Sequence, residues 1–184
     1  MKNINFLDGD KIAIIDIKDD IIGYEDKMKV HEQGILNRAF SVFIFNDKNE
    51  LLLQKRAANK YHSSSLWSNT CCSHLRFNEI MEEAASCRLK VEMGLNCNLK
   101  FIKKFSYKTS LSNNLIENEI DYIYFGWTNT NPIINTNEVS DYKWINVYEL
   151  KETINLNPDR FTYWLTEIIL MNDLFNIPSH SNIF

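Results

Sequence analysis

Apolar residues recur along the chain with two different spacings, which predict strands and helices. The runs 40–45 and 51–54 are almost continuously apolar, and the polar residues 46–50 lie between them, which predicts a hairpin of two buried strands. Shorter or alternating runs predict further strands at 11–16, 99–107, 119–127 and near 142–147.

Two other segments have the spacing of amphipathic helices. Residues 79–93 place apolar or small side chains among charged ones, and Gly94 follows as a C-terminal cap. A second helix is predicted at about 158–175 and is stopped by Pro178. Strands followed by a helix, more strands and a last helix predict an α/β (α+β) fold, in which helices cover both faces of a mixed sheet.

Two polar stretches have no clear period. One follows the first strand as far as Gly34, and the other covers 57–73, which we interpret as a loop. Long loops carried by a rigid sheet often hold functional residues, so the second stretch is a candidate site. Residues 178–184 are expected to form a flexible tail.

Composition and charge narrow the class of protein. The 184 residues are 45% hydrophobic and 12% aromatic, enough for one buried core, so we expect a single domain over 1–184. A net charge of −4 disfavours general binding to nucleic acid or to an anionic membrane. Without a long apolar run or a signal-like start, a cytoplasmic protein is expected. Its four cysteines lack Cys-x-x-Cys spacing and are expected to be free thiols.

Several residues could together bind a divalent cation. Glu117 and Glu119 alternate along a predicted strand and so project from one face, and His31 and His74 could add imidazole ligands. Spacing alone favours the simpler interpretation, exposed carboxylates on an edge strand and a loop histidine. His62 and His180 fit no pattern and receive no role.

The predicted helix at 79–93 also fits an eroded Nudix box, the signature of enzymes that hold diphosphates through metal ions. Glu79, Glu92 and Gly94 keep their places in that pattern, but Arg88 and Val91 occupy positions where the pattern has acids. Hydrolysis needs several such acids to hold metals and activate water, so it is disfavoured. One magnesium ion between Glu92 and a diphosphate remains feasible.

Three segments together resemble the type 1 isopentenyl-diphosphate isomerase family. They read Arg-Ala-Phe-Ser at 38–41, Leu-Trp-Ser-Asn-Thr-Cys-Cys-Ser-His at 66–74 and Ile-Glu-Asn-Glu at 116–119. The resemblance covers about residues 10–175. It implies a Nudix-type mixed sheet between helices, and conversion of isopentenyl to dimethylallyl diphosphate by protonation, a tertiary carbocation and loss of a proton on the opposite face.

The resemblance also implies roles for individual residues. Cys72 matches the catalytic cysteine, Glu119 the catalytic glutamate and Tyr107 a tyrosine that assists proton delivery. Trp164 matches a tryptophan whose ring stabilises the carbocation. Glu92 and the backbone carbonyl of Cys72 would hold a magnesium ion on the substrate.

The implied metal site consists of His31, His74, Glu117 and Glu119, with Asn37 where the family has a further histidine. An amide is a weaker ligand than imidazole for zinc or manganese, so Asn37 should weaken the site or shift its preference toward magnesium. The matching diphosphate-binding residues are Lys27, Arg56, Lys60 and Arg88.

Several functions remain open from the sequence. The first is an active isomerase with altered metal preference. A relative acting on a longer prenyl diphosphate and a degenerate scaffold follow, then a Nudix hydrolase and a diphosphate-binding or interaction module. The expected partner is a small prenyl diphosphate, without nucleic acid or membrane, and the chain is expected to be a monomer or weak homodimer.

Overall fold

The computed structural model describes residues 11–171, so the predicted tail at 178–184, Pro178 and His180 lie outside the described residues. The strands are β1 (Lys11–Ile15), β2 (Ile21–Asp26), β3 (Asn37–Phe45), β4 (Glu50–Arg56), β5 (Trp67–Ser68), β6 (Cys71–His74), β7 (Leu99–Ser110), β8 (Ile116–Trp127) and β9 (Val139–Asn146). The helices are α1 (Lys27–Gln33), α2 (Met81–Met93), α3 (Val147–Leu156) and α4 (Tyr163–Leu170), with short 3-10 helices η2 (Ser112–Asn114) and η3 (Pro158–Arg160).

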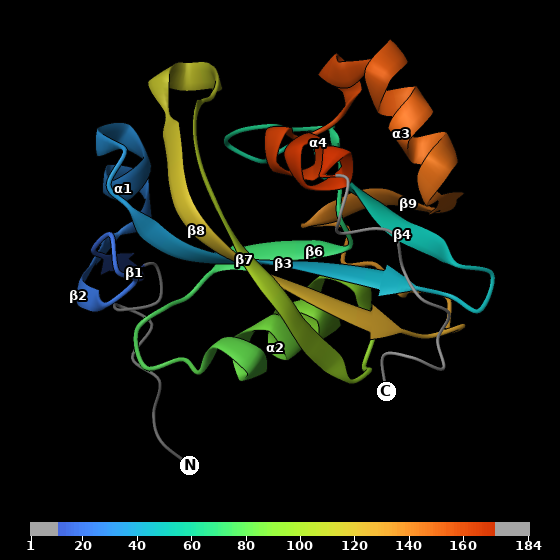
Figure 1. Ribbon diagram of the computed structural model, residues 1–184, viewed down its shortest axis with the longest axis horizontal. Coiled ribbons are helices and arrows are strands. Elements are labelled where there is room, and N and C mark those ends of the chain that lie inside the picture. Colours follow the sequence, from blue (N-terminus) through green and yellow to red (C-terminus); the bar gives the residue numbers. More distant parts are fainter. Residues whose placement is uncertain (1–10, 172–184) are drawn as a thin grey trace.

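Strand β3 organises the sheet. Along one edge it pairs in parallel with β8 over its whole length, from Asn37 opposite Glu119 to Phe45 opposite Trp127. Its other edge is shared by β1, β6 and β4 in turn, all antiparallel. The result is a mixed sheet, as the sequence predicts (Figure 1).

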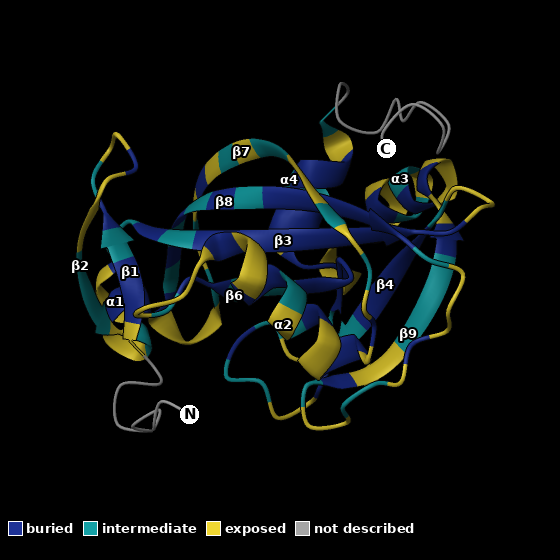
Figure 2. Cartoon of the chain, turned by 90° about the horizontal axis from the view of Figure 1, so that it is seen from below, coloured by how far each residue is buried: buried dark blue, intermediate teal, exposed yellow. Residues whose placement is uncertain are grey.

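Two hydrophobic cores lie on opposite faces of this sheet. Phe43 and Phe45 of β3 belong to the core that contains Leu165 of α4 and Leu150 of α3. Their neighbours Val42 and Ile44 belong to the core beneath α2. Because side chains alternate along a strand, a run that looks uniformly apolar in sequence supplies both cores. The helices therefore cover both faces, and the central strands β3, β4 and β8 are mostly buried, whereas β7 and β9 are partly exposed (Figures 1 and 2).

The predicted hairpin of β3 and β4 is present, since the two buried strands pair antiparallel across a polar turn, but the pairing is short. The two strands form only the pair Phe45–Leu51, after which β6 occupies the edge of β3 and β4 pairs with β5 and β9. Thr70 bridges the divergence, since its hydroxyl accepts from the Ile44 N–H (2.9 Å) and donates to the Leu52 carbonyl (2.6 Å). The sheet consequently splits beside β6.

Some elements do not appear in the sequence pattern. The polar stretch before Gly34 contains β2 and α1, the stretch 57–73 contains β5 and the start of β6, and α3 has no predicted counterpart. Helix α1 has seven residues, about two turns, which is too short to show a period, but its ends have clear signals. The Asp26 side chain accepts from the Lys29 N–H at the start, and Gly34 takes φ of 61° at the end.

The two predicted helices are present. Helix α2 ends where predicted, at Gly94, which has φ of 66°. The last predicted helix is divided into η3 and α4, and α4 ends at Leu170; the predicted continuation to 175 lies outside the described residues.

Candidate active site

One face of the sheet gathers the chemically active side chains. Cys72 and His74 lie two residues apart on β6, and Glu117 and Glu119 lie two residues apart on β8, so each pair shares one face of its strand. Strand β3 runs between β6 and β8. Tyr107 lies opposite Glu119 on β7. They project from the face of β8 that carries Ile123 and Phe125 in the α3–α4 core, so the site continues that face toward the strand ends.

A single cavity collects almost all residues predicted from the sequence. Its walls include the four predicted catalytic residues, the four predicted diphosphate-binding residues and four of the six predicted metal ligands: Cys72, Tyr107, Glu119, Trp164, Lys27, Arg56, Lys60, Arg88, His74, Glu92 and Glu117, with Glu119 serving in two sets. His31 packs against this wall, with its ring centroid 4.9 Å from that of His74. Asn37 lies opposite Glu119 in the β3–β8 register.

The Trp-Ser-Asn-Thr segment fixes Trp164 over the cavity. The Trp164 indole N–H lies 3.0 Å from the Asn69 side-chain oxygen and 3.1 Å from the Ser68 hydroxyl. The Asn69 amide nitrogen donates to the carbonyls of Val42 (3.2 Å) and Cys71 (2.7 Å), which ties the same residue to β3 and β6. These polar groups are buried and satisfy one another's hydrogen bonds, and the same bonds connect helix α4 to the segment that precedes Cys72.

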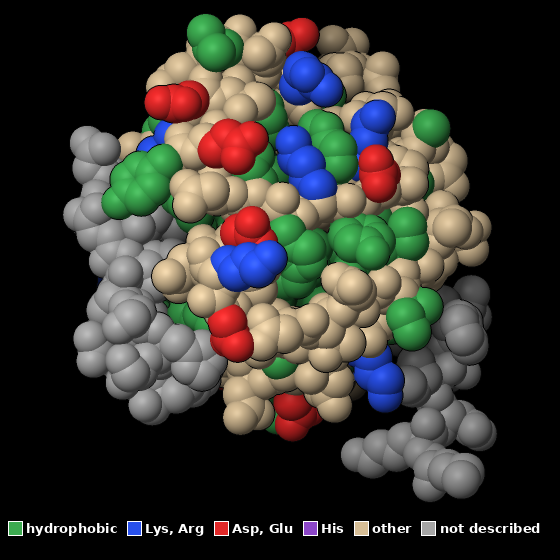
Figure 3. Space-filling model, turned by 90° about the vertical axis from the view of Figure 1, so that its right-hand side faces the viewer, with side chains coloured by type: hydrophobic (Ala, Val, Ile, Leu, Met, Phe, Trp, Pro, Cys, Tyr) green, Lys and Arg blue, Asp and Glu red, His purple; other side chains and the backbone are tan. Residues whose placement is uncertain are grey.

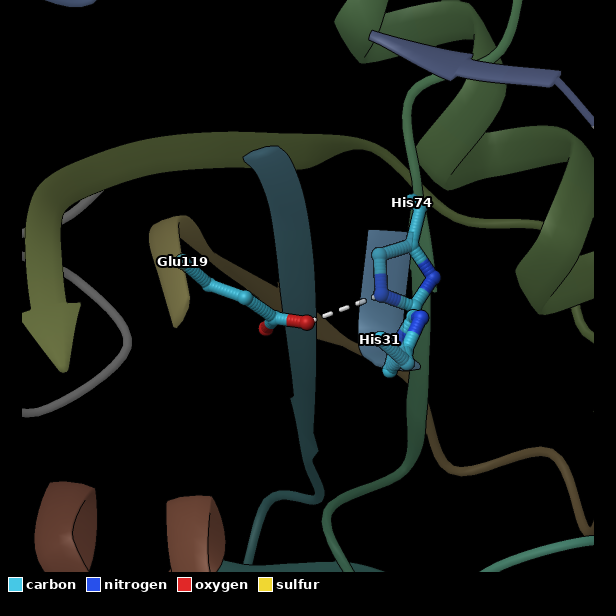
Figure 4. Close-up of side chains that lie close together, drawn as sticks. All are labelled: His31, His74 and Glu119. Carbon is cyan, nitrogen blue, oxygen red and sulfur yellow. Dashed lines mark hydrogen bonds and ion pairs between the residues drawn. The ribbon is translucent and has the colours of Figure 1, made fainter. Parts of the chain in front are cut away.

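The carboxylates of Glu117 and Glu119 lie close together and away from water. The Tyr107 hydroxyl lies 2.8 Å from Glu119 and 3.1 Å from Glu117, and His74 Nε2 lies 2.8 Å from Glu119 Oε1 (Figure 4). One hydroxyl proton serves only one carboxylate at a time. Burial raises the pKa of both carboxyl groups, and the charge of Glu119 raises the pKa of Glu117 further.

The histidines are arranged as neutral ligands. His31 Nδ1 donates to the Lys27 carbonyl (2.7 Å), so Nε2 carries the lone pair, and this atom is buried without a hydrogen-bond partner among the described residues. Burial lowers the pKa of His31 and lowers that of His74 strongly. Neutral imidazoles beside buried carboxylates are the donor set that a divalent cation requires. His31, His74 and Glu119 offer ligand atoms within 4.8 Å of one another (Figure 4).

Asn37 offers a weaker metal ligand to the same region. Its amide nitrogen donates to the carbonyls of Ile35 (3.2 Å) and Asn118 (3.1 Å). Its side-chain oxygen is buried and has no hydrogen-bond partner among the described residues. An amide oxygen of this kind can ligate a hard cation.

Burial and charge also set the state of the remaining cavity groups. Burial raises the pKa of the Cys72 thiol to about 12, so the sulfur keeps its proton at neutral pH. Burial, followed by the charges of Lys60 and Arg56, lowers the pKa of Lys27 to about 8. Arg88 donates to Glu92 (2.6 Å) and lies 3.6 Å from Glu138, which also pairs with Lys60. Glu138 thus links Arg88 to Lys60, and these two residues form the basic wall of the cavity together with Lys27 and Arg56.

The cavity contains residues that the sequence analysis missed. Gln54 donates to Glu92 (3.0 Å), and Asp121 accepts from Ser41 (2.7 Å). His62, which received no role, lines the cavity and is only 5% exposed. Asp121 could have been found, because it continues the alternation of Glu117 and Glu119 on one face of β8. His62 lies in a stretch without periodicity, so no local pattern indicates where its side chain points.

The simpler interpretation of Glu117 and Glu119 as exposed residues on an edge strand is wrong. Strand β8 pairs with β3 on one side and β7 on the other, and the two side chains are 3% and 4% exposed. The three described histidines are likewise buried, and the described part of the face in Figure 3 shows no histidine side chain.

Comparison with known proteins identifies the family. A NUDIX domain model matches residues 35–165. An isopentenyl-diphosphate Delta-isomerase 2 of Photorhabdus laumondii is 49% identical over 158 residues, covering 86% of this chain and 89% of that protein. An isopentenyl-diphosphate Delta-isomerase 1 of Aromatoleum aromaticum is 46% identical, covering 87% and 90%. The chain belongs to the isopentenyl-diphosphate Delta-isomerase family. This confirms the resemblance found in the sequence.

The fold agrees with this family assignment. The crystal structure of DR0079 from Deinococcus radiodurans superposes with a TM-score of 0.73 over 86% of this chain and 96% of that one, at 15% identity. A MutT protein from Methanosarcina mazei superposes with a TM-score of 0.60, covering 73% and 90% at 14% identity. These similarities show the Nudix fold. Within residues 11–171, every helix is too short or too polar to span a membrane.

Proposed function

We propose that this member of the isopentenyl-diphosphate isomerase family converts isopentenyl diphosphate to dimethylallyl diphosphate in a site that uses divalent cations. The observation that carries the proposal is the meeting of Cys72, Glu119, Tyr107 and Trp164 in one cavity. These residues come from β6, β8, β7 and α4, so the fold assembles a constellation that no local segment contains.

The arrangement suits proton transfer at both sides of a small alkene. Cys72 lies opposite Ser41 and Glu119 lies opposite Asn37 on the intervening strand β3, and both side chains line the cavity. Protonation of the terminal alkene carbon gives a tertiary cation, and loss of a proton from the carbon on its other side leaves the internal double bond. We propose that Glu119 and Cys72 exchange protons with the substrate, one on each side of the alkene. Tyr107 is hydrogen-bonded to Glu119 and assists it.

Trp164 is proposed to stabilise the cationic intermediate. Its ring already attracts a cation, since the Arg56 guanidinium carbon lies 5.4 Å from the ring centroid. Cation–π attraction contributes about 2 kcal/mol when the cation is desolvated, and Trp164 is only 3% exposed. The hydrogen bonds that the Trp164 N–H donates to Ser68 and Asn69 keep the ring in position for this role.

The basic wall is proposed to bind the diphosphate. Lys27, Arg56, Lys60 and Arg88 provide the charge that a net-acidic chain needs for a polyanionic ligand, and a guanidinium matches phosphate oxygens well. Arg88 is hydrogen-bonded to Glu92, and the two would separate on substrate binding: Arg88 would bind the diphosphate oxygens, and Glu92 with the Cys72 carbonyl would hold the magnesium ion.

A second cation is proposed at the histidines and buried carboxylates. The fit is supported by the unpartnered His31 Nε2 and by two carboxylates that share one tyrosine proton. When bound, a divalent cation would supply positive charge that favours ionised Glu119 and holds its carboxylate in place. Zinc, manganese and magnesium are all candidates.

Incubation with isopentenyl diphosphate and divalent cations in deuterated water tests the function. We expect deuterium in the recovered dimethylallyl diphosphate, because the transferred proton comes from groups that exchange with solvent. Release of inorganic phosphate would instead indicate a Nudix hydrolase, and neither product would indicate a binding module or a degenerate scaffold. A parallel reaction with a longer prenyl diphosphate tests the remaining alternative.

A further inference from the structure

His62 lies against the proposed cation site, in a position that local sequence does not reveal. Its ring stacks on His31, with centroids 5.9 Å apart and an interplanar angle of 27°. Its Nε2 atom lies 3.8 Å from Glu117 Oε1. His31, His62 and Glu117 offer ligand atoms within 4.8 Å of one another, as His31, His74 and Glu119 do.

These distances match those between ligands of one cation. A separation of 3.8 Å is too long for a hydrogen bond between His62 and Glu117. In octahedral coordination, ligands at about 2.1 Å from an ion lie about 3.0 Å apart as neighbours and about 4.2 Å apart when opposite. A cation between His62 and Glu117 would therefore satisfy both groups with small movements of their side chains.

The tautomer of His31 limits the arrangement to one ion. Its Nδ1 donates to the Lys27 carbonyl, so it has a single lone pair, on Nε2. Both candidate groups contain His31, and one lone pair binds one ion. The two groups therefore combine into one set of five metal ligands, in which His62 and Glu117 join His31, His74 and Glu119.

We propose that His62 is a direct ligand of this cation and supplies its third imidazole. The proposal rests on the cation site of the proposed function and adds a ligand to it. Three imidazoles and two carboxylates favour zinc or manganese over magnesium, which prefers oxygen ligands. His62 thus reverses the preference for magnesium that Asn37 alone would imply.

The surroundings of His62 suit a ligand better than a packing residue. Its Nδ1 lies 3.2 Å from the Ser63 hydroxyl, which can accept its proton and leave Nε2 free to bind metal. The Tyr61 ring meets it edge-on at 4.5 Å and Trp164 lies 6.1 Å away, so the ring is held rigidly. A ligand held by its neighbours loses little entropy when the cation binds.

The test is titration of metal-free protein with zinc in competition with a chromophoric chelator. For His62→Ala we expect the zinc affinity to fall on the order of 100-fold, since a ligand is lost. His62→Gln retains polarity and much of the volume, and should show a similar loss if the alanine variant fails to fold. Ser64→Ala, an exposed change on the same loop, is the matched control and should bind zinc like the unaltered protein.

The absorption spectrum of bound cobalt gives a second readout, independent of activity. Removal of His62 should shift the visible bands, because a water or chloride replaces an imidazole. Zinc affinity within twofold of the unaltered protein, with an unchanged cobalt spectrum, would overturn the proposal while leaving the isomerase site intact. Failure of the unaltered protein to bind any divalent cation would instead remove the cation site itself.

Discussion

At the scale of single residues, Asp19 shows how a buried charge stabilises the structure next to the site. It takes φ of 68° after β1, and its carboxylate accepts from Arg38 (2.8 Å), Lys104 (2.6 Å) and Tyr122 (2.5 Å). Burial alone would raise the pKa of Asp19, but these three hydrogen bonds outweigh it, so the pKa lies below its usual value. The residue joins the β1–β2 hairpin to β3, β7 and β8.

We expect Asp19→Asn to destabilise the protein by about 2 kcal/mol at pH 7, because three charge-assisted hydrogen bonds weaken. Asparagine tolerates positive φ, so the backbone is not strained. The depressed pKa means that the carboxylate stabilises the fold above its unfolded pKa and stops doing so as the pH falls through the folded value. Urea unfolding should show a smaller difference in the free energy of unfolding between the two proteins near pH 3 than at pH 7. An equal difference at both pH values would refute this explanation.

At the scale of elements, Gly94 determines where α2 ends and where the chain turns away. Its φ is 66°, and a Cβ atom there would lie 2.7 Å from the Ile133 carbonyl oxygen. The Ile133 N–H in turn donates a hydrogen bond to the Met93 carbonyl (2.8 Å), so the end of the helix is fixed to the segment before β9. Glu92, the proposed magnesium ligand, lies only two residues before this glycine.

Gly94→Ala is expected to lower the free energy of unfolding by about 2 kcal/mol, because alanine is strained at a left-handed φ and its Cβ would lie too close to Ile133. The matched control is Gly23→Ala in β2, where the nearest atoms to a new Cβ are Ile14 side-chain carbons at 3.5 Å and 3.6 Å. Thermal unfolding of both variants should show a clear decrease in melting temperature for position 94 and a much smaller one for position 23. Equal decreases would mean that the conformation of Gly94 is not the cause.

Elements differ in how far the sequence determines them. Helix α2 has a clear end signal at Gly94, and strands β3 and β4 have nearly continuous apolar runs, so these elements can be predicted. Strand β6 cannot, because its residues alternate between the α2 core at Cys71 and the cavity at Cys72 within a polar segment. The pairing of β3 with β8 joins residues about eighty positions apart, and no local pattern encodes that choice.

At the scale of the whole molecule, the site lies where the sheet splits. Strands β3 and β4 separate after one residue pair, and β6 occupies the edge of β3. Helix α4 lies over this part of the sheet (Figure 1), and its residue Trp164 lines the cavity. The resemblance to the family supplied most residues of the site in advance, because the motif segments carry them. It could not supply His62, Gln54 or Asp121, whose positions depend on how separate strands and loops meet.

The central claim is that the Cys72 thiol and the Glu119 carboxyl exchange protons with the two sides of one substrate. Its most direct test is the rate of deuterium-labelled dimethylallyl diphosphate formation by Cys72→Ala, Glu119→Gln and Cys71→Ala. Cys71 is the matched control, because it is the adjacent thiol but belongs to the core beneath α2. We predict losses on the order of a thousandfold or more for Cys72→Ala and Glu119→Gln, and retained turnover for Cys71→Ala. Turnover near that of the unaltered protein in either of the first two variants would contradict the account.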